Sequence, residues 1–372
     1  MHTPHVTVLG AGLIGKAMVY DLCREYAVTV ADHSPHALEA LAHLPAGQAC
    51  ADLTATGALE SVSAHADLVL SAMPGALGFE ILRRLIGMGK KVVDISFTEE
   101  DPQTLDEMAR EHGAVVVPDA GVCPGLSNLV AGYAATHLFA LLKKYVCYVG
   151  GLPVAPREPW YYRNPFAAES VVDEYTRRCR FRVEGKDVTL EPLSEPEELE
   201  ELEFPGAGRL VAFNTDGIRT LLGNLPQVPT LVEKTLRYRE HYSLMRSLQQ
   251  AGFLEPAYVG TFTEVARSGW RFEEGEEDIT VMRLVFEGTD TAGAEARLSF
   301  DLCDRYDRQA RLLSMARTTG FTATAIARLM LAGKLTAPGV HAPEKLGMDR
   351  GHYEAILGHL KSRGIGFTEK RG

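Results

Sequence analysis

Three glycines near the start of the chain have the spacing that holds a phosphate group. Gly10, Gly12 and Gly15 form a G-x-G-x-x-G pattern that follows an apolar run and opens a segment of helical periodicity. In that setting the first glycine permits a tight turn, the second lets the backbone approach a pyrophosphate, and the third lets helix and strand pack closely. The helix N-terminus, with Leu13 and Ile14 in its first turn, offers N–H groups to the phosphates. The pattern predicts a dinucleotide site.

A carboxylate stands where the ribose of a dinucleotide is expected. Asp32 closes the apolar run at 27–31, about 20 residues beyond the glycines, where a carboxylate accepts from both ribose hydroxyls. The same carboxylate repels a 2′-phosphate, and residues 33–36 (HSPH) hold no Arg or Lys to offset that repulsion. The sequence therefore predicts NAD rather than NADP as the cofactor.

Two further turns are expected beside the cofactor. Ala72, Met73 and Pro74 stand at the end of one buried run, and Ser96 follows the next. Ligands of doubly wound sheets bind outside the carboxyl ends of the strands, so these residues are predicted to flank the cofactor. Asp94 can face the cofactor or cap a turn, and the sequence favours neither role.

These residues depend on a sheet of buried strands. In the first third of the chain, short Val/Ile/Leu-rich runs alternate with helical segments, which is typical of a parallel sheet covered on both faces. The predicted strands are 5–9, 27–31, 67–73, 91–95 and 114–118, and the predicted helices include 13–25 and 103–112.

The pattern changes after about residue 145. Alternating apolar and polar residues predict antiparallel strands with one exposed face, an acidic stretch predicts a solvated surface segment, and helical periodicity then returns. The strands are 179–190, 279–288 and 295–307, the acidic stretch is 194–204, and the helices are 321–333 and 350–363.

The predicted fold class is α/β in three parts. An N-terminal Rossmann domain with a doubly wound parallel sheet spans residues 1–124. An inserted α+β domain with a mixed or antiparallel sheet spans 125–320, and C-terminal helices at 321–372 return to the Rossmann domain.

Composition narrows the classes of function. The chain has 372 residues and a formal net charge of −11, so it lacks the basic footprint of a nucleic-acid or anionic-membrane partner. No run approaches the ~20 apolar residues of a membrane span, and no signal segment opens the chain, so a cytoplasmic protein is expected. The six cysteines form no C-x-x-C pair, which argues against a metal site or a disulfide framework.

Four later segments carry a resemblance to a known family. The chain resembles the saccharopine dehydrogenase-like group through its Rossmann start and through segments in the same order along nearly the whole chain. They are PDAGVCPG at 118–125, YVGGLP at 148–153, EKTLRYREH at 233–241 and MARTTG at 315–320. Within that group it is most similar to the lysine 6-dehydrogenases, whose second domain is smaller than that of the saccharopine reductases.

The resemblance implies a reaction and an assembly. It implies oxidation of the ε-amine of L-lysine by NAD, which gives allysine, ammonia and NADH, followed by cyclisation of allysine to a piperideine carboxylate. It also implies a homodimer joined through the second domain. One residue departs from the pattern, because saccharopine reductases typically have Cys before Gly-Gly-Leu-Pro and this chain has Val149.

Such a reaction needs a proton acceptor. A lysine amine has a pKa of about 10.4, so it must lose a proton before hydride can leave, and a base must then activate water. Asp119 follows the strand at 114–118 and precedes Pro124, Gly125 and a helix near Ser127, on the cofactor side of the sheet. It is the first candidate base, with a purely turn-stabilising role as the alternative.

Basic residues are candidates for holding the substrate. Arg237, Arg239 and His241 share one face if their segment is extended. The two arginines suit the substrate carboxylate and His241 suits a proton shuttle, while a basic surface patch is the alternative. Thr215 and Asp216 are candidates for binding the α-amino group, although such a turn also forms without a ligand.

The remaining motif residues are less specific. Gly151 of the Gly-Gly-Leu-Pro segment is expected at the substrate, and Thr318 and Thr319 suit a helix cap or a ligand equally. Cys123 has no base beside it in sequence, so it is not expected to be a nucleophile.

Two other functions remain open at this stage. An enzyme of the same group acting on saccharopine or carboxynorspermidine predicts a longer pocket with more cationic anchors. A non-catalytic regulator that binds NAD predicts cofactor binding without turnover, because a Rossmann fold does not fix function.

Overall fold

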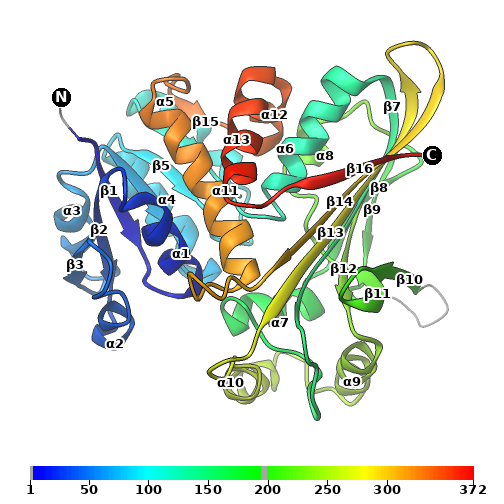
Figure 1. The fold of residues 1–372 in the computed structure, drawn as a ribbon, viewed down its shortest axis with the longest axis horizontal. Coiled ribbons are helices and arrows are strands. Elements are labelled where there is room, and N and C mark those ends of the chain that lie inside the picture. Colours follow the sequence, from blue (N-terminus) through cyan, green and yellow to red (C-terminus); the bar gives the residue numbers. More distant parts are fainter. Residues whose placement is uncertain (1–2, 194–198) are drawn as a thin grey trace. The chain divides into compact units, whose positions relative to one another are not determined.

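The computed structural model describes residues 3–193 and 199–372. It divides into two compact units: unit 1 comprises Met1–Tyr133 and Ala316–Gly364, and unit 2 comprises Ala134–Met315 and Ile365–Gly372. The predicted borders at residues 124/125 and 320/321 stand near these divisions. Each unit contains its own sheet and is described separately below (Figure 1).

Unit 1 contains a seven-stranded parallel sheet in the order β3-β2-β1-β4-β5-β6-β15. The predicted doubly wound parallel sheet is therefore confirmed, with the strand order typical of a dinucleotide-binding fold. The strands are β1 His5–Leu9, β2 Ala27–Asp32, β3 Gly47–Cys50, β4 Leu68–Ser71, β5 Lys91–Asp94, β6 Val115–Val117 and β15 Gly339–Val340.

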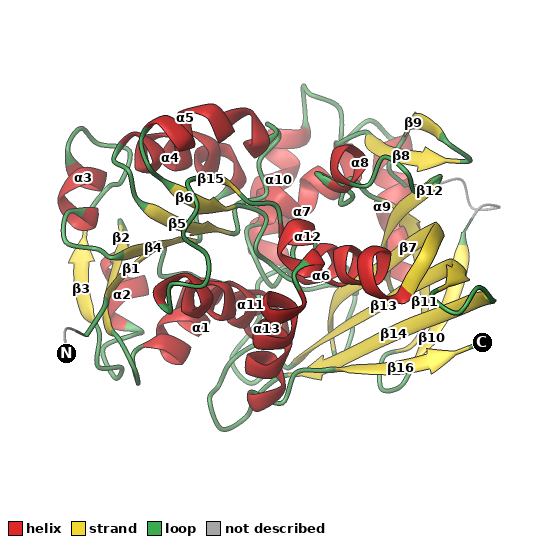
Figure 2. Cartoon of the chain, turned by 90° about the horizontal axis from the view of Figure 1, so that it is seen from above, coloured by secondary structure: helices red, strands yellow, loops and turns green. Residues whose placement is uncertain are grey.

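Helices cover both faces of this sheet. Figure 2 shows α4 and α5 on one face and α1 and α11 on the other, as the near-continuous burial of Val6, Val8 and Leu9 in β1 requires. The helices are α1 Leu13–Leu22, α2 Pro35–Glu39, α3 Ala58–Ser63, α4 Gly75–Gly87, η1 Pro102–Leu105, α5 Asp106–Glu111, α6 Leu126–Tyr133, α11 Ser314–Leu331, α12 Pro343–Met348 and α13 Arg350–Ser362.

The C-terminal helices return to unit 1, as predicted. A Cβ at Gly320 of α11 would lie 3.2 Å from the Ala17 Cβ of α1. A Cβ at Gly347 of α12 would collide with the Leu129 carbonyl of α6. Because a side chain at either glycine would push the helices apart, these close approaches depend on glycine.

Helix α11 begins seven residues before the predicted start at 321. The Asp278 carboxylate accepts from the Ser314 N–H at 2.6 Å and the Met315 N–H at 3.0 Å, which satisfies the first donors of the helix. The cap comes from a strand 36 residues upstream, so local sequence does not reveal it.

Unit 2 contains a nine-stranded mixed sheet. Its main order is β10-β11-β12-β7-β13-β14-β16, and β8 joins β12 and β9. Strands β7 and β12 are parallel and the other pairs are antiparallel. The strands are β7 Phe139–Pro153, β8 Cys179–Val183, β9 Lys186–Leu190, β10 Glu200–Phe204, β11 Gly208–Asn214, β12 Thr230–Arg237, β13 Asp278–Asp290, β14 Glu295–Arg305 and β16 Phe367–Arg371.

The helices of unit 2 are α7 Ala168–Thr176, α8 Leu221–Asn224, α9 Arg239–Gln250 and α10 Val259–Gly269, and a π-helical turn, η2, spans Ala134–Leu138. The predicted strands at 179–190, 279–288 and 295–307 are confirmed as the hairpin β8–β9 and as β13 and β14. Part of the predicted acidic surface segment, 194–198, lies outside the described residues, and Glu200–Phe204 forms the edge strand β10.

Candidate functional site

The glycine turn of unit 1 has the geometry of a phosphate cradle. Gly10 has φ +97°, and a Cβ there would lie 2.7 Å from the Ala72 carbonyl oxygen. A Cβ at Gly15 would collide with the Gly10 carbonyl, whereas a Cβ at Gly12 would meet nothing within 4 Å. Gly12 therefore leaves open space at the N-terminus of α1, where a pyrophosphate fits.

Asp32 lies at the end of β2 beside this turn. Its Oδ2 accepts from the Ala11 N–H at 2.7 Å, and its Oδ1 accepts from the Ser34 N–H at 2.8 Å. The carboxylate thus orders the glycine turn in addition to presenting charge at the predicted ribose position. Its sequence neighbour His33 has an 82% exposed side chain and lies 3.3 Å from Asp32 Oδ1.

The other predicted cofactor residues stand at neighbouring strand ends. The Ala72 N–H donates to the Leu9 carbonyl at 2.8 Å, which brings the end of β4 against the end of β1. Met73 packs on the core, and Pro74 precedes α4. Ser96 is 3% exposed, and a Cβ at Gly78 would collide with it, so its side chain lies against α4.

Asp119 occupies a turn after β6. The residue is 2% exposed and has φ +51°, in the left-handed region that few residues other than glycine adopt. Gly125 closes the turn at φ +134°, and a Cβ there would lie 2.7 Å from the Asp119 carbonyl oxygen. The Leu126 N–H donates to the Gly121 carbonyl at 2.8 Å, so the turn leads directly into α6.

A second carboxyl group lies beside this turn. Asp94 ends β5, is 1% exposed, and accepts from the Ser96 hydroxyl at 2.7 Å. Its carbonyl oxygen accepts from the Ala120 N–H at 2.9 Å. Burial raises the pKa of Asp94 to about 7, and the nearby charge of Asp119 acts in the same direction. The sequence left two roles open for Asp94, facing the cofactor or capping a turn. It did not reveal that Asp94 lies close to Asp119.

Two threonines of α11 and one cysteine complete this part of unit 1. Thr318 is fully buried and Thr319 is 7% exposed, within a helix that already began at Ser314, so neither is its N-cap. A Cβ at Gly121 would lie 3.3 Å from Thr319 Cγ2. Cys123 is half-buried in the Asp119 turn.

The predicted substrate arginine of unit 2 is buried. Arg237 is 2% exposed at the end of β12 and pairs with Glu174 of α7. Its Nε donates to the Tyr175 hydroxyl at 3.2 Å, and its guanidinium lies 4.7 Å from the centre of the Tyr162 ring. Binding a substrate carboxylate through Arg237 would require a rearrangement of this cluster.

His241 belongs to the same buried cluster. Its Nδ1 lies 2.7 Å from the Trp160 carbonyl, which can only accept, and its Nε2 lies 2.9 Å from the Tyr175 hydroxyl. Burial and then the charge of Arg237 lower the pKa of His241 to about 3. The imidazole is therefore neutral near pH 7, with Nδ1 as donor and Nε2 as acceptor.

Arg237, Arg239 and His241 do not share one extended face. Strand β12 ends at Arg237, and Tyr238 precedes helix α9, which contains the other two residues. Arg239 is half exposed and pairs with Glu201, whereas His241 is fully buried. The alternating apolar and basic residues therefore span the end of a strand and the start of a helix, and the predicted common face does not form.

The predicted amino-group ligands already have protein partners. The Thr215 hydroxyl donates to Glu233 Oε1 at 2.9 Å, and Asp216 forms an ion pair with Arg180 at 2.9 Å. Gly151 lies in β7, where a Cβ would come 2.5 Å from Met315 Cε. Sequence reasoning did not single out Glu233 or Arg180 as these partners, because each lies on another element.

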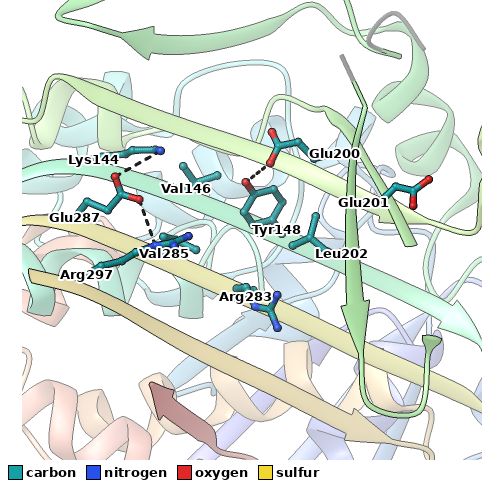
Figure 3. A pocket seen from close by; sticks show the side chains of 10 residues that line it. All are labelled: Lys144, Val146, Tyr148, Glu200, Glu201, Leu202, Arg283, Val285, Glu287 and Arg297. Atoms are coloured by element: carbon teal, nitrogen blue, oxygen red, sulfur yellow. Dashed lines mark hydrogen bonds and ion pairs between the residues drawn. The ribbon is translucent and has the colours of Figure 1, made fainter. Parts of the chain in front are cut away.

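A cavity of about 400 Å³ opens on one face of the unit 2 sheet (Figure 3). Glu287 lies between Lys144 and Arg297, and the Tyr148 hydroxyl donates to Glu200 at 2.5 Å. None of the predicted site residues lines this cavity, which is formed by Lys144, Val146, Tyr148, Glu200, Glu201, Leu202, Arg283, Val285, Glu287 and Arg297.

The part of the chain that the structure describes has neither a cluster of metal ligands nor a helix suited to crossing a membrane. Within residues 3–193 and 199–372, no group of three or more His, Cys, Asp or Glu side chains is arranged to hold a metal ion. In the same ranges, no helix has the length and apolar character needed to cross a membrane.

Two consecutive segments of the chain match the two domains of one protein family. Residues 6–117 match the saccharopine dehydrogenase NADP binding domain. Residues 121–365 match the saccharopine dehydrogenase C-terminal domain, which is well over half of the chain. The chain belongs to the saccharopine dehydrogenase family. The sequence resemblance is thereby confirmed at the level of the family.

Relatives within the saccharopine dehydrogenase family are distant. The saccharopine dehydrogenase (NADP(+), L-glutamate-forming) of Schizosaccharomyces pombe is 26% identical over 264 residues, covering 68% of this chain and 58% of that protein. Its namesake from Saccharomyces cerevisiae is 25% identical over 267 residues, covering 68% and 58%. The chain thus matches a little over half the length of these curated relatives.

Solved structures show the same fold. Apo saccharopine dehydrogenase (L-Glu forming) from Saccharomyces cerevisiae has a TM-score of 0.79 at 20% identity, covering 99% of this chain and all of that one. Homospermidine synthase from Legionella pneumophila, solved with NAD, has a TM-score of 0.68 at 10% identity, covering 99% and 92%.

Proposed function

We propose that this protein is an NAD-dependent dehydrogenase that oxidises the ε-amine of L-lysine. The reaction releases ammonia and gives allysine, which then cyclises. The observation that supports it most strongly is the buried Asp119 turn at the carboxyl end of β6. The glycine cradle stands at the carboxyl end of β1 in the same parallel sheet. Cofactor and substrate both approach that edge in doubly wound sheets.

Asp119 is the proposed proton acceptor of the reaction. A nicotinamide dinucleotide held at the glycine turn and Asp32 would supply the acceptor for a hydride from the carbon that bears nitrogen. The substrate amine is protonated near pH 7, with a pKa of about 10.4, so a carboxylate first attracts the ammonium and then takes its proton. Once that proton has passed to solvent, the carboxylate accepts a proton from the water molecule that attacks the iminium carbon. Ammonia leaves when the resulting carbinolamine collapses to the aldehyde.

The cofactor preference rests on Asp32. A carboxylate at that position favours two ribose hydroxyls over a 2′-phosphate, although the relatives named above are NADP(+) enzymes. We expect NAD to bind at least about 10-fold more tightly than NADP. Fluorescence titrations of the wild type and Asp32→Ala test this, because the variant should reverse or abolish the preference. An unchanged ratio of the two dissociation constants would remove Asp32 from the assignment.

A second candidate substrate is saccharopine. Curated relatives at 25–26% identity carry that activity in their names. Val149 stands before Gly-Gly-Leu-Pro where saccharopine reductases typically have Cys, which weakens the case for a saccharopine pocket. Carboxynorspermidine is a third substrate to test, and a regulator that binds NAD without turnover is the alternative from another class.

The deciding experiment follows NADH formation on mixing the protein with NAD and L-lysine, saccharopine or carboxynorspermidine in parallel. Turnover of lysine alone supports the proposal, and turnover of another substrate replaces it. Asp119→Asn should lower kcat by about 10²–10⁴-fold with little change in NAD affinity. Asparagine suits this test because it tolerates the positive φ of residue 119, so the charge changes without added backbone strain. Unaltered kcat in Asp119→Asn would exclude Asp119 as the base.

A further inference from the structure

Asp94 is a buried acid, and its side-chain hydrogen-bond partner within the described residues is a hydroxyl group and not a cation. It ends β5, is 1% exposed, and accepts a hydrogen bond at 2.7 Å from the hydroxyl group of Ser96, two residues beyond the strand end. Helix α4 presents Gly78, which has no side chain, to Ser96. Buried carboxylates are normally paired with a cation or give up their charge, so this environment favours the protonated acid.

The charged group that acts on Asp94 is the candidate base. Asp119 raises the pKa of Asp94, in addition to the larger effect of burial, and the pKa reaches about 7. The two residues are also linked through the backbone, because the Ala120 N–H donates to the Asp94 carbonyl at 2.9 Å. A negative charge nearby disfavours a second one, so the charge of Asp119 adds to burial in keeping the proton on Asp94.

We propose that Asp94 is a positioning residue for Asp119: it acts as an uncharged acid whose hydrogen bond with Ser96 orders the end of β5, and its carbonyl holds the Asp119 turn there through the Ala120 N–H. The catalytic consequence rests on the proposed function of Asp119. The protonation state does not, so the two parts can be tested separately.

Substitution by asparagine separates the neutral form from the charged form. An amide keeps one acceptor oxygen and a donor, as the protonated carboxyl does, and cannot ionise. Asp94→Asn should keep kcat within about 2-fold of the wild type near pH 7, and Asp94→Ala should lose about 10-fold in kcat with a smaller change in KM. Recovery by asparagine, but not by alanine, shows that residue 94 needs a polar side chain of this size and does not need a negative charge.

A stability measurement tests the proton without any substrate. A carboxyl group that keeps its proton in the folded protein up to about pH 7 and loses it near 3.9 when unfolded makes the wild type less stable as pH rises between these values. Asp94→Asn lacks this dependence. Its unfolding midpoint, relative to that of the wild type, should therefore rise between about pH 4 and pH 8.

The control is Asp106→Asn. Asp106 also accepts a backbone hydrogen bond in unit 1, from the Val340 N–H at 2.8 Å, but its surroundings lower its pKa rather than raise it. Relative to the wild type, the midpoint of Asp106→Asn should not rise over the same pH range. If the two variants differ in this way, the pH dependence of Asp94→Asn cannot be a general effect of replacing an aspartate in unit 1.

Each outcome has a defined meaning. If the midpoint difference between Asp94→Asn and the wild type does not change with pH, Asp94 is ionised in the fold and the proposal is wrong. If the difference changes but Asp94→Asn loses as much kcat as Asp119→Asn, Asp94 transfers a proton and does not merely position. If no substrate is turned over by the wild type, the proposed function fails, while the stability arm still decides the state of Asp94.

Discussion

Gly12 and Gly15 are three residues apart in one turn, but their surroundings differ. A Cβ at Gly15 would collide with the Gly10 carbonyl, whereas a Cβ at Gly12 would meet no protein atom within 4 Å. We therefore expect Gly12 to matter for binding the dinucleotide and Gly15 to matter for folding of the turn.

Alanine at each position should therefore give different results. Gly12→Ala should keep the unfolding midpoint and weaken NAD binding by about 10-fold or more, because the methyl group enters the space needed by the pyrophosphate. Gly15→Ala should lower both the midpoint and the affinity, because the turn itself must open. Thermal unfolding and NAD titration check both, and equal midpoints for the two variants would contradict the distinction.

Arg237 forms a buried ion pair, whereas the ion pair of the nearby Arg239 is exposed. The first is buried against Glu174, Tyr175 and Tyr162, whereas Arg239 has a 54% exposed side chain and pairs with Glu201 at the surface. Removing one partner of a buried ion pair leaves the other charge uncompensated, which is much more costly than removing an exposed partner.

Paired substitutions can separate folding from substrate binding in unit 2. Arg237→Ala should cost about 3–5 kcal/mol in the free energy of unfolding, and Arg239→Ala less than about 1 kcal/mol. Urea unfolding measures both. If Arg237→Ala instead folds normally and only raises KM, the residue is a substrate anchor, as the sequence alone predicted.

At the scale of elements, the C-terminal helices hold the cofactor-binding helix in place. Asp21 of α1 is 2% exposed and contacts four side chains, which are Thr324 and Arg328 of α11, His359 of α13, and Arg363, which follows α13. Thr324 donates at 2.6 Å, His359 lies at 2.9 Å, and Arg363 donates at 2.5 Å. Because α1 also carries the glycine turn at its other end, these contacts link the C-terminal segment to the cofactor site.

This cluster predicts a dependence of stability on pH. Burial alone would raise the pKa of Asp21, but the hydrogen bonds from His359 and Thr324 and the charge of Arg328 outweigh it and depress the pKa far below its usual value. A depressed folded-state pKa stabilises the protein above the unfolded value of about 3.9, and this contribution is lost as pH falls below it. Asp21→Asn should therefore unfold more easily than the wild type near pH 7.

The same variant should approach the wild type in acid. Denaturant unfolding at a series of pH values tests this, because the gap between the two midpoints should narrow below about pH 4. A gap that stays constant across the range would mean that the hydrogen bonds to Asp21, and not its charge, provide the stabilisation.

At the scale of the whole molecule, two units with separate sheets divide the features of the sequence between them. Unit 1 holds the glycine turn, Asp32, Asp94 and Asp119, which are the residues that carry the proposal. Unit 2 holds the basic residues predicted at the substrate, with Arg237 and His241 inside an aromatic cluster. The resemblance to family members extends over both units, because the two matched domains together span residues 6–365.

Local pattern was enough for the cofactor side of the molecule. Buried strands, the spacing of Gly10, Gly12 and Gly15, and Asp32 at a strand end are all consequences of neighbours in sequence, so the parallel sheet was predicted correctly. Segments with weaker periodicity, such as α2 and β3, were not singled out, because short elements with few apolar residues depend on packing for their stability.

The tertiary structure alone decided the environment of each charged group. Sequence placed Arg237 and His241 on a common strand face, but the chain turns into helix α9 between them and buries both among aromatic rings. Likewise Asp94 and Asp119 are 25 residues apart in the chain, and only the adjacency of β5 and β6 brings them together. Burial and through-space charge depend on contacts between distant elements, which is why residue types could be predicted as reactive without their protonation states or partners.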